Sequence, residues 1–145
     1  MRVLAAPDKF RGTATAAEVA GAIAAAVRAA GGRAREVPLS DGGEGFLEVF
    51  GGPNRATVVT GPLGEPVEAG WRLDGRTAVV EMARASGLVL AGGAAGNDPI
   101  AATTTGTGEL IAAALDAGAR RIIVGHGGST TPPTTLPWNE AASTK

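Results

Sequence analysis

Several residue types are scarce or missing in this 145-residue sequence, and each absence excludes a class of protein. There is no cysteine, which excludes disulfide bonds and thiolate metal sites. His126 is the only histidine, so a histidine-based metal cluster or catalytic triad would need partners that the chain lacks, and we interpret His126 as a loop residue. Aromatic residues make up only 3%, so the core must be built from alanine, valine, leucine and isoleucine, a composition that favours an α/β protein.

Long apolar runs and clusters of one charge are also missing. No apolar stretch approaches the roughly 20 residues that span a bilayer, and the N-terminus begins with a strand-like run rather than a signal peptide. The 13 basic and 14 acidic residues give a formal net charge of −1, and no Lys/Arg run is long enough to bind a nucleic-acid backbone. We therefore expect a cytoplasmic protein the size of one ordinary domain, with neither a membrane nor a nucleic acid as partner.

A strand and a helix are predicted at the start of the chain. Arg2–Pro7 is a short aliphatic run ended by proline, which is typical of a buried strand whose end delivers charged residues to a loop. Thr15 and Glu18 have the spacing of a capping box, and Gly31 follows the helix that they begin. The apolar stripe predicted for this helix consists of Val19, Ile23 and Val27.

The same alternation then repeats. Residues 33–39 have the pattern of a second strand, and residues 46–50 that of a short apolar helix. Strand, helix, strand, helix favours parallel strands joined by a right-handed crossover. The expected fold class is therefore α/β, with a Rossmann-like or flavodoxin-like parallel sheet.

An antiparallel element is predicted further along the chain. Two strand-like runs, 67–73 and 76–82, flank Asp74-Gly75, which is a strong hairpin signal. We expect this hairpin to begin a second subdomain, with the boundary near residues 57–66.

The last third of the chain ends without a regular pattern. Residues 91–96 are glycine-rich and predict a surface connection, 109–117 a helix and 120–124 a strand. Residues 130–145 hold three prolines and show no period, so we expect a disordered tail there.

Four loops rich in glycine or charge lie where predicted strands end or a helix begins. They are Asp8–Thr13, Ser40–Gly45, Thr105–Gly108 and Gly125–Ser129. Glycine lets backbone N–H groups converge on an anion, and a helix N-terminus adds partial positive charge. Each loop also has a simpler interpretation, because glycine and aspartate form turns and charged side chains commonly face solvent. No Walker A, dinucleotide or protein-kinase motif decides between these readings, so the residues alone indicate only an anion-binding α/β protein.

Six short motifs follow one another along the chain. They are Ala6-Pro7-Asp8-Lys9-Phe10-Arg11-Gly12, Asp41-Gly42-Gly43-Glu44-Gly45, Val59-Thr60-Gly61-Pro62-Leu63-Gly64-Glu65-Pro66-Val67, Glu81-Met82-Ala83-Arg84-Ala85-Ser86-Gly87-Leu88, Thr105-Gly106-Thr107-Gly108-Glu109-Leu110 and Ile122-Ile123-Val124-Gly125. In this order they resemble the glycerate kinase family, over residues 1 to about 129. The resemblance implies transfer of the γ-phosphoryl group of ATP, with Mg²⁺, to a hydroxyl of D-glycerate, in the cleft of a two-domain α/β architecture.

The resemblance also suggests roles for residues in these motifs. Asp41 could orient or deprotonate the attacking hydroxyl, or hold Mg²⁺, and Asp8 is the alternative carboxylate. Lys9 and Arg11 could bind the glycerate carboxylate, and no metal-ligand set is assigned. The catalytic candidates are Asp41, Lys9 and Asp8, the substrate-binding candidates are Arg11, Gly42, Gly43 and Glu44, and the phosphate-binding candidates are Thr105, Gly106, Thr107, Gly108, Gly127, Gly128 and Ser129.

The order of motifs stops after Ser129. Where the family pattern resembles a glycine-rich continuation containing Asp-Gly-Gly, this sequence reads Thr130-Thr131-Pro132-Pro133, and no aspartate follows. We therefore expect residues 130–145 to lie outside the family pattern and the chain to be incomplete relative to the family, through a premature stop after a reading-frame shift. The alternative is a non-catalytic anion- or nucleotide-binding α/β module, which would bind its ligand without turnover.

Overall fold

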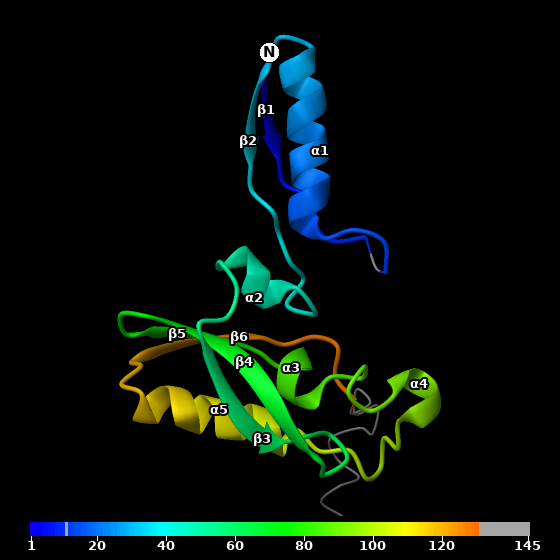
Figure 1. Ribbon diagram of the computed structural model, residues 1–145, viewed down its shortest axis with the longest axis vertical. Coiled ribbons are helices and arrows are strands. Elements are labelled where there is room, and N and C mark those ends of the chain that lie inside the picture. The colour runs from blue at the N-terminus through cyan, green and yellow to red at the C-terminus, as the bar shows by residue number, and fades with distance from the viewer. Residues whose placement is uncertain (11, 131–145) are drawn as a thin grey trace, which may run out of the picture.

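The computed structural model describes residues 1–10 and 12–130. In chain order its elements are β1 (Arg2–Ala5), α1 (Ala16–Ala29), β2 (Arg33–Glu36), α2 (Phe46–Val49), β3 (Arg55–Thr60), β4 (Pro66–Asp74), β5 (Thr77–Glu81), α3 (Ala83–Ser86), α4 (Gly93–Gly96), α5 (Thr105–Asp116) and β6 (Arg121–Gly125). The strands form a two-stranded sheet, β1-β2, and a four-stranded sheet in the order β3-β4-β5-β6. Figure 1 shows two units, one built on each sheet, with α2 at their junction. The predicted α/β class is confirmed.

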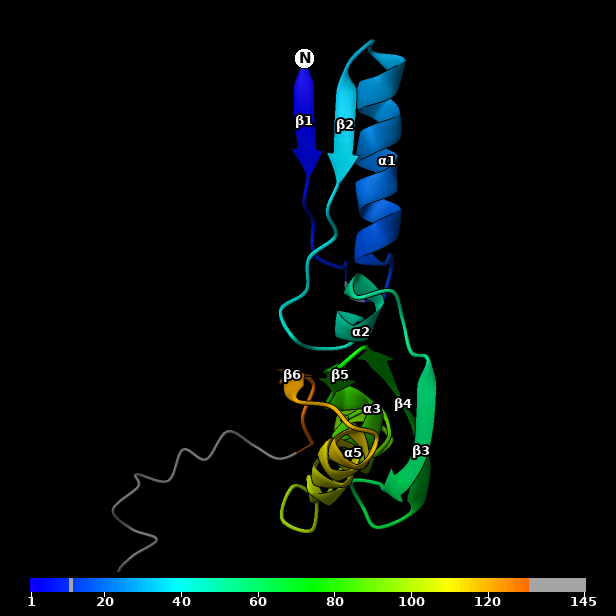
Figure 2. The same ribbon diagram turned by 90° about the vertical axis from the view of Figure 1, so that its left-hand side faces the viewer.

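The first unit is the parallel strand–helix–strand motif expected from the start of the sequence. β1 and β2 pair in parallel from Arg2↔Arg33 to Ala5↔Glu36. Figure 2 shows the two strands side by side, with α1 running along them. The ladder continues beyond β2, because the Leu39 amide donates a hydrogen bond of 2.9 Å to the Pro7 carbonyl. This explains why the sequence pattern of a strand extends to residue 39.

The buried face of α1 differs from the predicted stripe of larger aliphatic side chains. Its buried residues are Ala16, Ala20 and Ala24. Ile23 is 38% exposed, so the prediction that it belongs to the buried stripe was wrong. The small alanine side chains let the helix approach a narrow two-stranded sheet closely, and the valines border that contact instead of filling it.

The capping box at the start of α1 gives a pH-dependent prediction. The Thr15 amide donates to Glu18 Oε2 at 2.8 Å, and the Glu18 amide donates to Thr15 Oγ1 at 3.2 Å. The backbone hydrogen bond from Thr15, followed by the side-chain hydrogen bond, lowers the pKa of Glu18 below its ordinary value. A lowered folded-state pKa contributes stability that is present above the ordinary pKa and is lost as the pH falls through the lowered value.

We therefore expect Glu18→Gln to be less stable than the unchanged chain at pH 7 and equally stable in acid. Glutamine keeps a capping oxygen but loses the charge-assisted hydrogen bond. Urea unfolding followed by circular dichroism between pH 7 and pH 2 measures the difference. A difference that stays constant over this range would contradict the assignment of the effect to the Glu18 charge.

The second unit is a mixed sheet. β3 pairs with β4, and β4 with β5, in antiparallel fashion, whereas β5 and β6 are parallel. The predicted hairpin is confirmed, with its turn one residue later than expected, because Asp74 pairs with Thr77 and leaves Gly75 and Arg76 as the loop. β3 was not predicted. The second sheet starts with this strand, and the predicted subdomain boundary near residues 57–66 stays a prediction.

The core of the second unit lies between the sheet and α5. Apart from partly buried neighbours, its members are Val59, Ala69, Trp71, Ala78, Val80, Ala85, Leu110, Ala114 and Ala119. The only aromatic ring among them is satisfied at its polar atom, since Trp71 Nε1 donates to Thr57 Oγ1 at 3.0 Å. The core is otherwise aliphatic, as the low aromatic content predicted.

Three further segments predicted from the sequence can be compared with the structure. The helix predicted over residues 109–117 is α5 and begins earlier, at Thr105. The connection predicted over residues 91–96 contains a one-turn helix, α4. Thr130, the first residue of the predicted tail, is buried, and its amide donates to the Ser86 carbonyl at 3.3 Å. The rest of that tail, residues 131–145, lies outside the described residues.

Among residues 1–10 and 12–130, no helix is long and apolar enough to cross a membrane.

Candidate functional site

A cleft of about 600 Å³ lies at the junction of the two units. One wall comes from residues 8–10 and 12–18, in the loop after β1 and the start of α1. The other comes from residues 38–40, 44–45 and 48–49, between β2 and the end of α2, and the second unit contributes Glu81 and Arg84. The charged ends of β1 and β5 are thereby brought to the same cavity.

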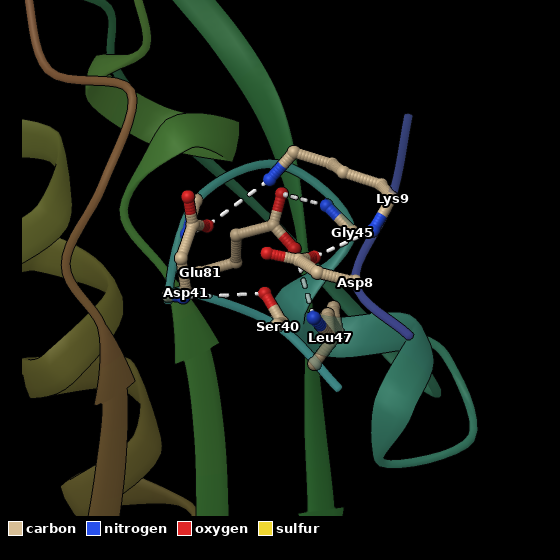
Figure 3. Close-up of polar contacts among 9 residues, drawn as sticks. Asp8, Lys9, Ser40, Asp41, Gly45, Leu47 and Glu81 are labelled. Atoms are coloured by element: carbon tan, nitrogen blue, oxygen red, sulfur yellow. Dashed lines mark hydrogen bonds and ion pairs between the residues drawn. The ribbon is translucent and has the colours of Figure 1, made fainter. Parts of the chain in front are cut away.

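Lys9 and Asp41 bridge the two walls. Lys9 Nζ lies 3.1 Å from Asp41 Oδ1, and Figure 3 shows the lysine side chain reaching across to the aspartate. The lysine side chain is 16% exposed and that of the aspartate 49% exposed. Asp8 lines the same cleft, and its Oδ1 accepts a hydrogen bond of 2.7 Å from the Lys9 amide. The structure therefore brings the three catalytic candidates together: Asp8 and Lys9 line the cleft, and Asp41, which is not among its lining residues, is joined to it through Lys9 and is half exposed.

The loop that carries Asp41 uses its own side chains to order its backbone. The Gly42 amide donates to Ser40 Oγ at 3.2 Å, and the Gly43 amide donates to Asp41 Oδ1 at 2.9 Å. Gly42 has a φ of +90°, a conformation that other residues rarely adopt. Because these two amides already have side-chain acceptors, this loop contributes Glu44 to the cleft and places Asp41 beside Lys9 more readily than it presents N–H donors.

The glycine loop after β6 packs against the Asp41 loop. A Cβ atom added to Gly127 would lie 2.7 Å from Gly43 Cα, and one added to Gly125 would lie 2.3 Å from the Phe46 ring. A Cβ on Gly128 would lie 2.6 Å from Glu44 Oε1. These glycines therefore have a packing role: they let two loops approach without side chains between them. His126 is exposed on this loop, in agreement with its interpretation as a loop residue.

The phosphate-binding candidates of α5 lie away from this cleft. Thr105, Gly106, Thr107 and Gly108 form the first turn of the helix, and none of them lines the cavity. Gly106 packs against β3, and Thr107 is buried, with its Oγ1 2.9 Å from Ser86 Oγ. Thr105 and Gly108 are exposed. Ser129 forms an isolated antiparallel bridge with Gly87, next to Ser86, so it lies between the two regions.

Glu81 and Arg84 are residues of the cleft to which the sequence analysis assigned no role. Glu81 is 2% exposed, and its two carboxylate oxygens accept hydrogen bonds from the Gly45 and Leu47 amides (Figure 3). Arg84 forms an ion pair with Glu48, and its Nε lies 3.7 Å from Glu81 Oε1. The available signal was a carboxylate at the end of an otherwise apolar strand, the same signal that Asp8 gives after β1. Arg11, a substrate-binding candidate, lies outside the described residues.

The side chains of the described residues do not form a metal cage. No group of three or more His, Cys, Asp or Glu residues that could hold a metal ion occurs in residues 1–10 and 12–130. Mg²⁺ is commonly held by one or two carboxylates together with phosphate oxygens and water. Asp41 and Asp8 are carboxylates of the kind that can take part in such a site.

Comparison with known proteins shows to which family the chain belongs. The family model described as the glycerate kinase family matches residues 3–134. The chain belongs to the glycerate kinase family. The match runs five residues beyond Ser129, into residues that the structure does not describe, so the predicted departure from the family pattern after Ser129 stays a prediction.

Named relatives of the glycerate kinase family agree with this assignment. The chain is 50% identical to a glycerate kinase of Bacillus subtilis (strain 168) and 47% identical to a glycerate 2-kinase of Escherichia coli (strain K12), in each case over 90% of this chain and 36% of the relative. A crystal structure assigned as glycerate kinase 2 from Salmonella typhimurium LT2 superposes with a TM-score of 0.75 at 44% identity, over 90% of this chain and 37% of that one. The chain thus spans little more than a third of the length of these relatives.

Proposed function

We propose that this chain supplies the acceptor side of an ATP-dependent glycerate kinase, whose reaction converts D-glycerate and ATP to phosphoglycerate and ADP. The observation that carries this function is the Lys9–Asp41 pair, in which Lys9 lines the cleft between the two units and holds the half-exposed Asp41 carboxylate. Membership of the glycerate kinase family supplies the substrate class. A small hydroxy acid needs a cation for its carboxylate and a base for its hydroxyl, and this pair offers both.

Asp41 is the group proposed to act on the hydroxyl. Its carboxylate is half exposed and fixed by Lys9 and the Gly43 amide, so it can accept the hydroxyl proton as the oxygen attacks the γ-phosphorus of ATP. The bond from that phosphorus to the bridging oxygen of ADP breaks, and the electrons remain on ADP. The proton on Asp41 then returns to solvent, which balances the reaction.

Binding of the substrate carboxylate is assigned to the first wall of the cleft. The described cations that line the cavity are Lys9 and Arg84, and Arg84 already pairs with Glu48. Lys9 contacts Asp41 through one hydrogen bond and carries three ammonium donors, so it can bind a second carboxylate at the same time. Mg²⁺, held by Asp41 or Asp8 together with the phosphates, would neutralise the charge that develops on the transferred group.

The ATP phosphates are assigned to the glycine-rich segments of the second unit. Thr105 and Gly108 are exposed at the start of α5, and Gly108 has open space beside it, whereas the Thr105 amide donates to Thr103 Oγ1 at 3.1 Å. A helix N-terminus favours an anion. Ser129 lies between this turn and the cleft. Gly106, Thr107 and Gly127 are engaged in packing or hydrogen bonding within the fold, so their contribution is to hold these segments in place.

Turnover by the 145-residue chain tests this function. We expect D-glycerate-dependent ADP release with ATP and Mg²⁺, and a loss of at least about 100-fold in Asp41→Asn, because the amide cannot take the hydroxyl proton. Asp116→Asn, at the exposed end of α5, is the matched control and should keep full activity. Equal rates in the unchanged chain and Asp41→Asn would exclude Asp41 as the base.

Binding without turnover is the second candidate function. It is favoured by the position of Thr105–Gly108, none of which lines the cleft, so that the two halves of the reaction do not share one cavity in the described residues. Isothermal titration calorimetry with ATP and Mg²⁺ separates the two functions. Saturable ATP binding by a folded chain that releases no ADP in the presence of D-glycerate would establish the binding module and remove the kinase.

A further inference from the structure

Glu81 is a buried carboxylate at the floor of the cleft whose position suggests a defined task. It is the last residue of β5 and lies in register with Gly125, the last residue of β6, and the next amide, that of Met82, donates to the Gly125 carbonyl at 3.0 Å. The backbone of Glu81 is therefore fixed by β6, whereas the ladder with β4 ends at Val79. Only 2% of the residue is exposed.

The carboxylate spans the start of α2. Oε1 accepts a hydrogen bond of 3.3 Å from the Gly45 amide, and Oε2 accepts one of 2.8 Å from the Leu47 amide. Arg84 Nε, itself buried, lies 3.7 Å from Oε1 and supplies a positive charge without a hydrogen bond. A buried charge is costly unless it is paired and hydrogen-bonded, and here two backbone donors and one cation offset that cost.

The contacts lead from Glu81 to Asp41 in three short steps. Gly45 lies within the turn that the Phe46 amide closes by donating to the Gly43 carbonyl at 3.0 Å. The Gly43 amide in turn donates to Asp41 Oδ1 at 2.9 Å. Glu81 thus holds the turn whose first residue, Gly43, donates to the Asp41 carboxylate. Figure 3 shows the Glu81 carboxylate bonded to Gly45 and Leu47, with Asp41 nearby.

Burial and bonding exclude a direct part for Glu81 in proton transfer. Both of its oxygens accept backbone amide protons, and almost none of its surface is exposed, so a substrate hydroxyl cannot replace these partners without disrupting α2. Asp41, with a half-exposed side chain, is the carboxylate that a ligand can reach.

We propose that Glu81 is a positioning residue: by binding the Gly45 and Leu47 amides, it anchors the Asp41 loop to the end of β5 and holds the Asp41 carboxylate beside Lys9, which lines the cleft. This role rests on the proposed function for its catalytic consequence. The anchoring itself is a property of the folded chain and can be measured without turnover.

The first test compares Glu81→Gln with the control Glu68→Gln, whose glutamate is exposed on β4. Glutamine has one acceptor oxygen and an NH₂ group, so one of the two amides loses its acceptor. In Glu81→Gln we expect amide hydrogen exchange at Gly45 and Leu47 to accelerate at least about tenfold and backbone order at Gly42 and Gly43 to fall, while the amides of Val80 and Leu110 keep their protection. The control should change none of these amides. Unchanged exchange at Gly45 and Leu47 in a folded Glu81→Gln would overturn the proposal.

A measurement on the unchanged chain decides the matter if Glu81→Gln does not fold. Amide hydrogen exchange in the unchanged chain should be slow at both Gly45 and Leu47, because each amide donates to the same buried carboxylate. Exchange of either amide at the rate of an unstructured chain, while the amides of Val80 and Leu110 stay protected, would show that Glu81 does not hold it.

Kinetics then connect the anchor to the reaction. If the unchanged chain turns over, Glu81→Gln and Glu81→Asp should lower kcat about 10- to 100-fold with the KM for ATP little changed, because a misplaced reacting group costs rate rather than nucleotide affinity. Aspartate keeps the charge but is one methylene shorter and cannot span both amides. Full kcat in either variant would overturn the positioning role. If the unchanged chain is inactive but amide exchange at Gly45 and Leu47 still accelerates in Glu81→Gln, the kinase function is excluded for this chain and the anchoring role of Glu81 is supported.

Discussion

Gly106→Ala is expected to lower the free energy of unfolding by about 2 kcal/mol or more. A Cβ atom at this position would lie 2.1 Å from the Thr60 carbonyl oxygen and 3.1 Å from Val59 Cγ2. The first of these atoms belongs to the backbone of β3 and cannot move aside as the end of a long side chain can. The helix must shift away from the sheet, and the core contacts of α5 weaken with it.

Gly108→Ala is the matched control, two residues further along the same turn. A Cβ there would have no neighbour within 4 Å. Alanine is favoured over glycine inside a helix by about 1 kcal/mol, so this variant should be as stable as the unchanged chain or slightly more stable. Urea unfolding of both variants gives the comparison, and equal losses would contradict the packing role of Gly106. Weaker ATP binding by a stable Gly108→Ala would instead support a phosphate contact at residue 108.

Leu110→Ala is expected to cost about 2 to 5 kcal/mol of unfolding free energy. Leu110 is fully buried between α5 and the second sheet, in a core made mostly of small aliphatic residues. The alanines around it cannot extend to fill the space, so a cavity remains. Chemical unfolding monitored by the fluorescence of Trp71, which lies in the same core, should show the lower unfolding free energy.

Leu115→Ala tests whether the loss comes from burial or from helix composition. Leu115 lies on the same helix and is 54% exposed, so its truncation should change stability by less than about 1 kcal/mol. Similar losses in the two variants would mean that α5 does not pack on the sheet through Leu110.

Local signals in the sequence were sufficient for much of the fold. The Thr15 and Glu18 spacing located the start of α1, and Asp74-Gly75 located the hairpin, because capping and tight turns depend on a few adjacent residues. β3 was missed although Ala56–Val59 is rich in β-branched residues and Gly61-Pro62 follows the strand, because the run lacks a strict alternation of apolar and polar residues. The alanine face of α1 was missed because the pattern shows which residues are apolar, whereas the narrow sheet determines which of them can be buried.

The candidate site was predictable in part for a similar reason. Asp8, Lys9 and Asp41 drew notice because they follow predicted strands, and the family resemblance suggested their roles. Asp8 and Lys9 line the cleft, and Asp41 pairs with Lys9. Glu81 ends an apolar strand in the same way, but its task depends on the Gly45 and Leu47 amides, more than thirty residues away in sequence, and no local pattern records such a contact. The packing roles of Gly106 and Gly127 likewise depend on β3 and on the Asp41 loop.

The place of β6 in the sheet determines when the candidate site can exist during synthesis. β3, β4 and β5 follow one another and pair through short connections, but residues 82–120 separate β5 from its parallel neighbour β6. Closing that long connection is entropically costly and slow. A nascent chain that has emerged only through α5 already carries Lys9, Asp41 and Glu81, yet it lacks the glycines of 125–128 on which the Asp41 loop rests. The side chains of the candidate site are therefore synthesised before the glycine segment against which the Asp41 loop packs.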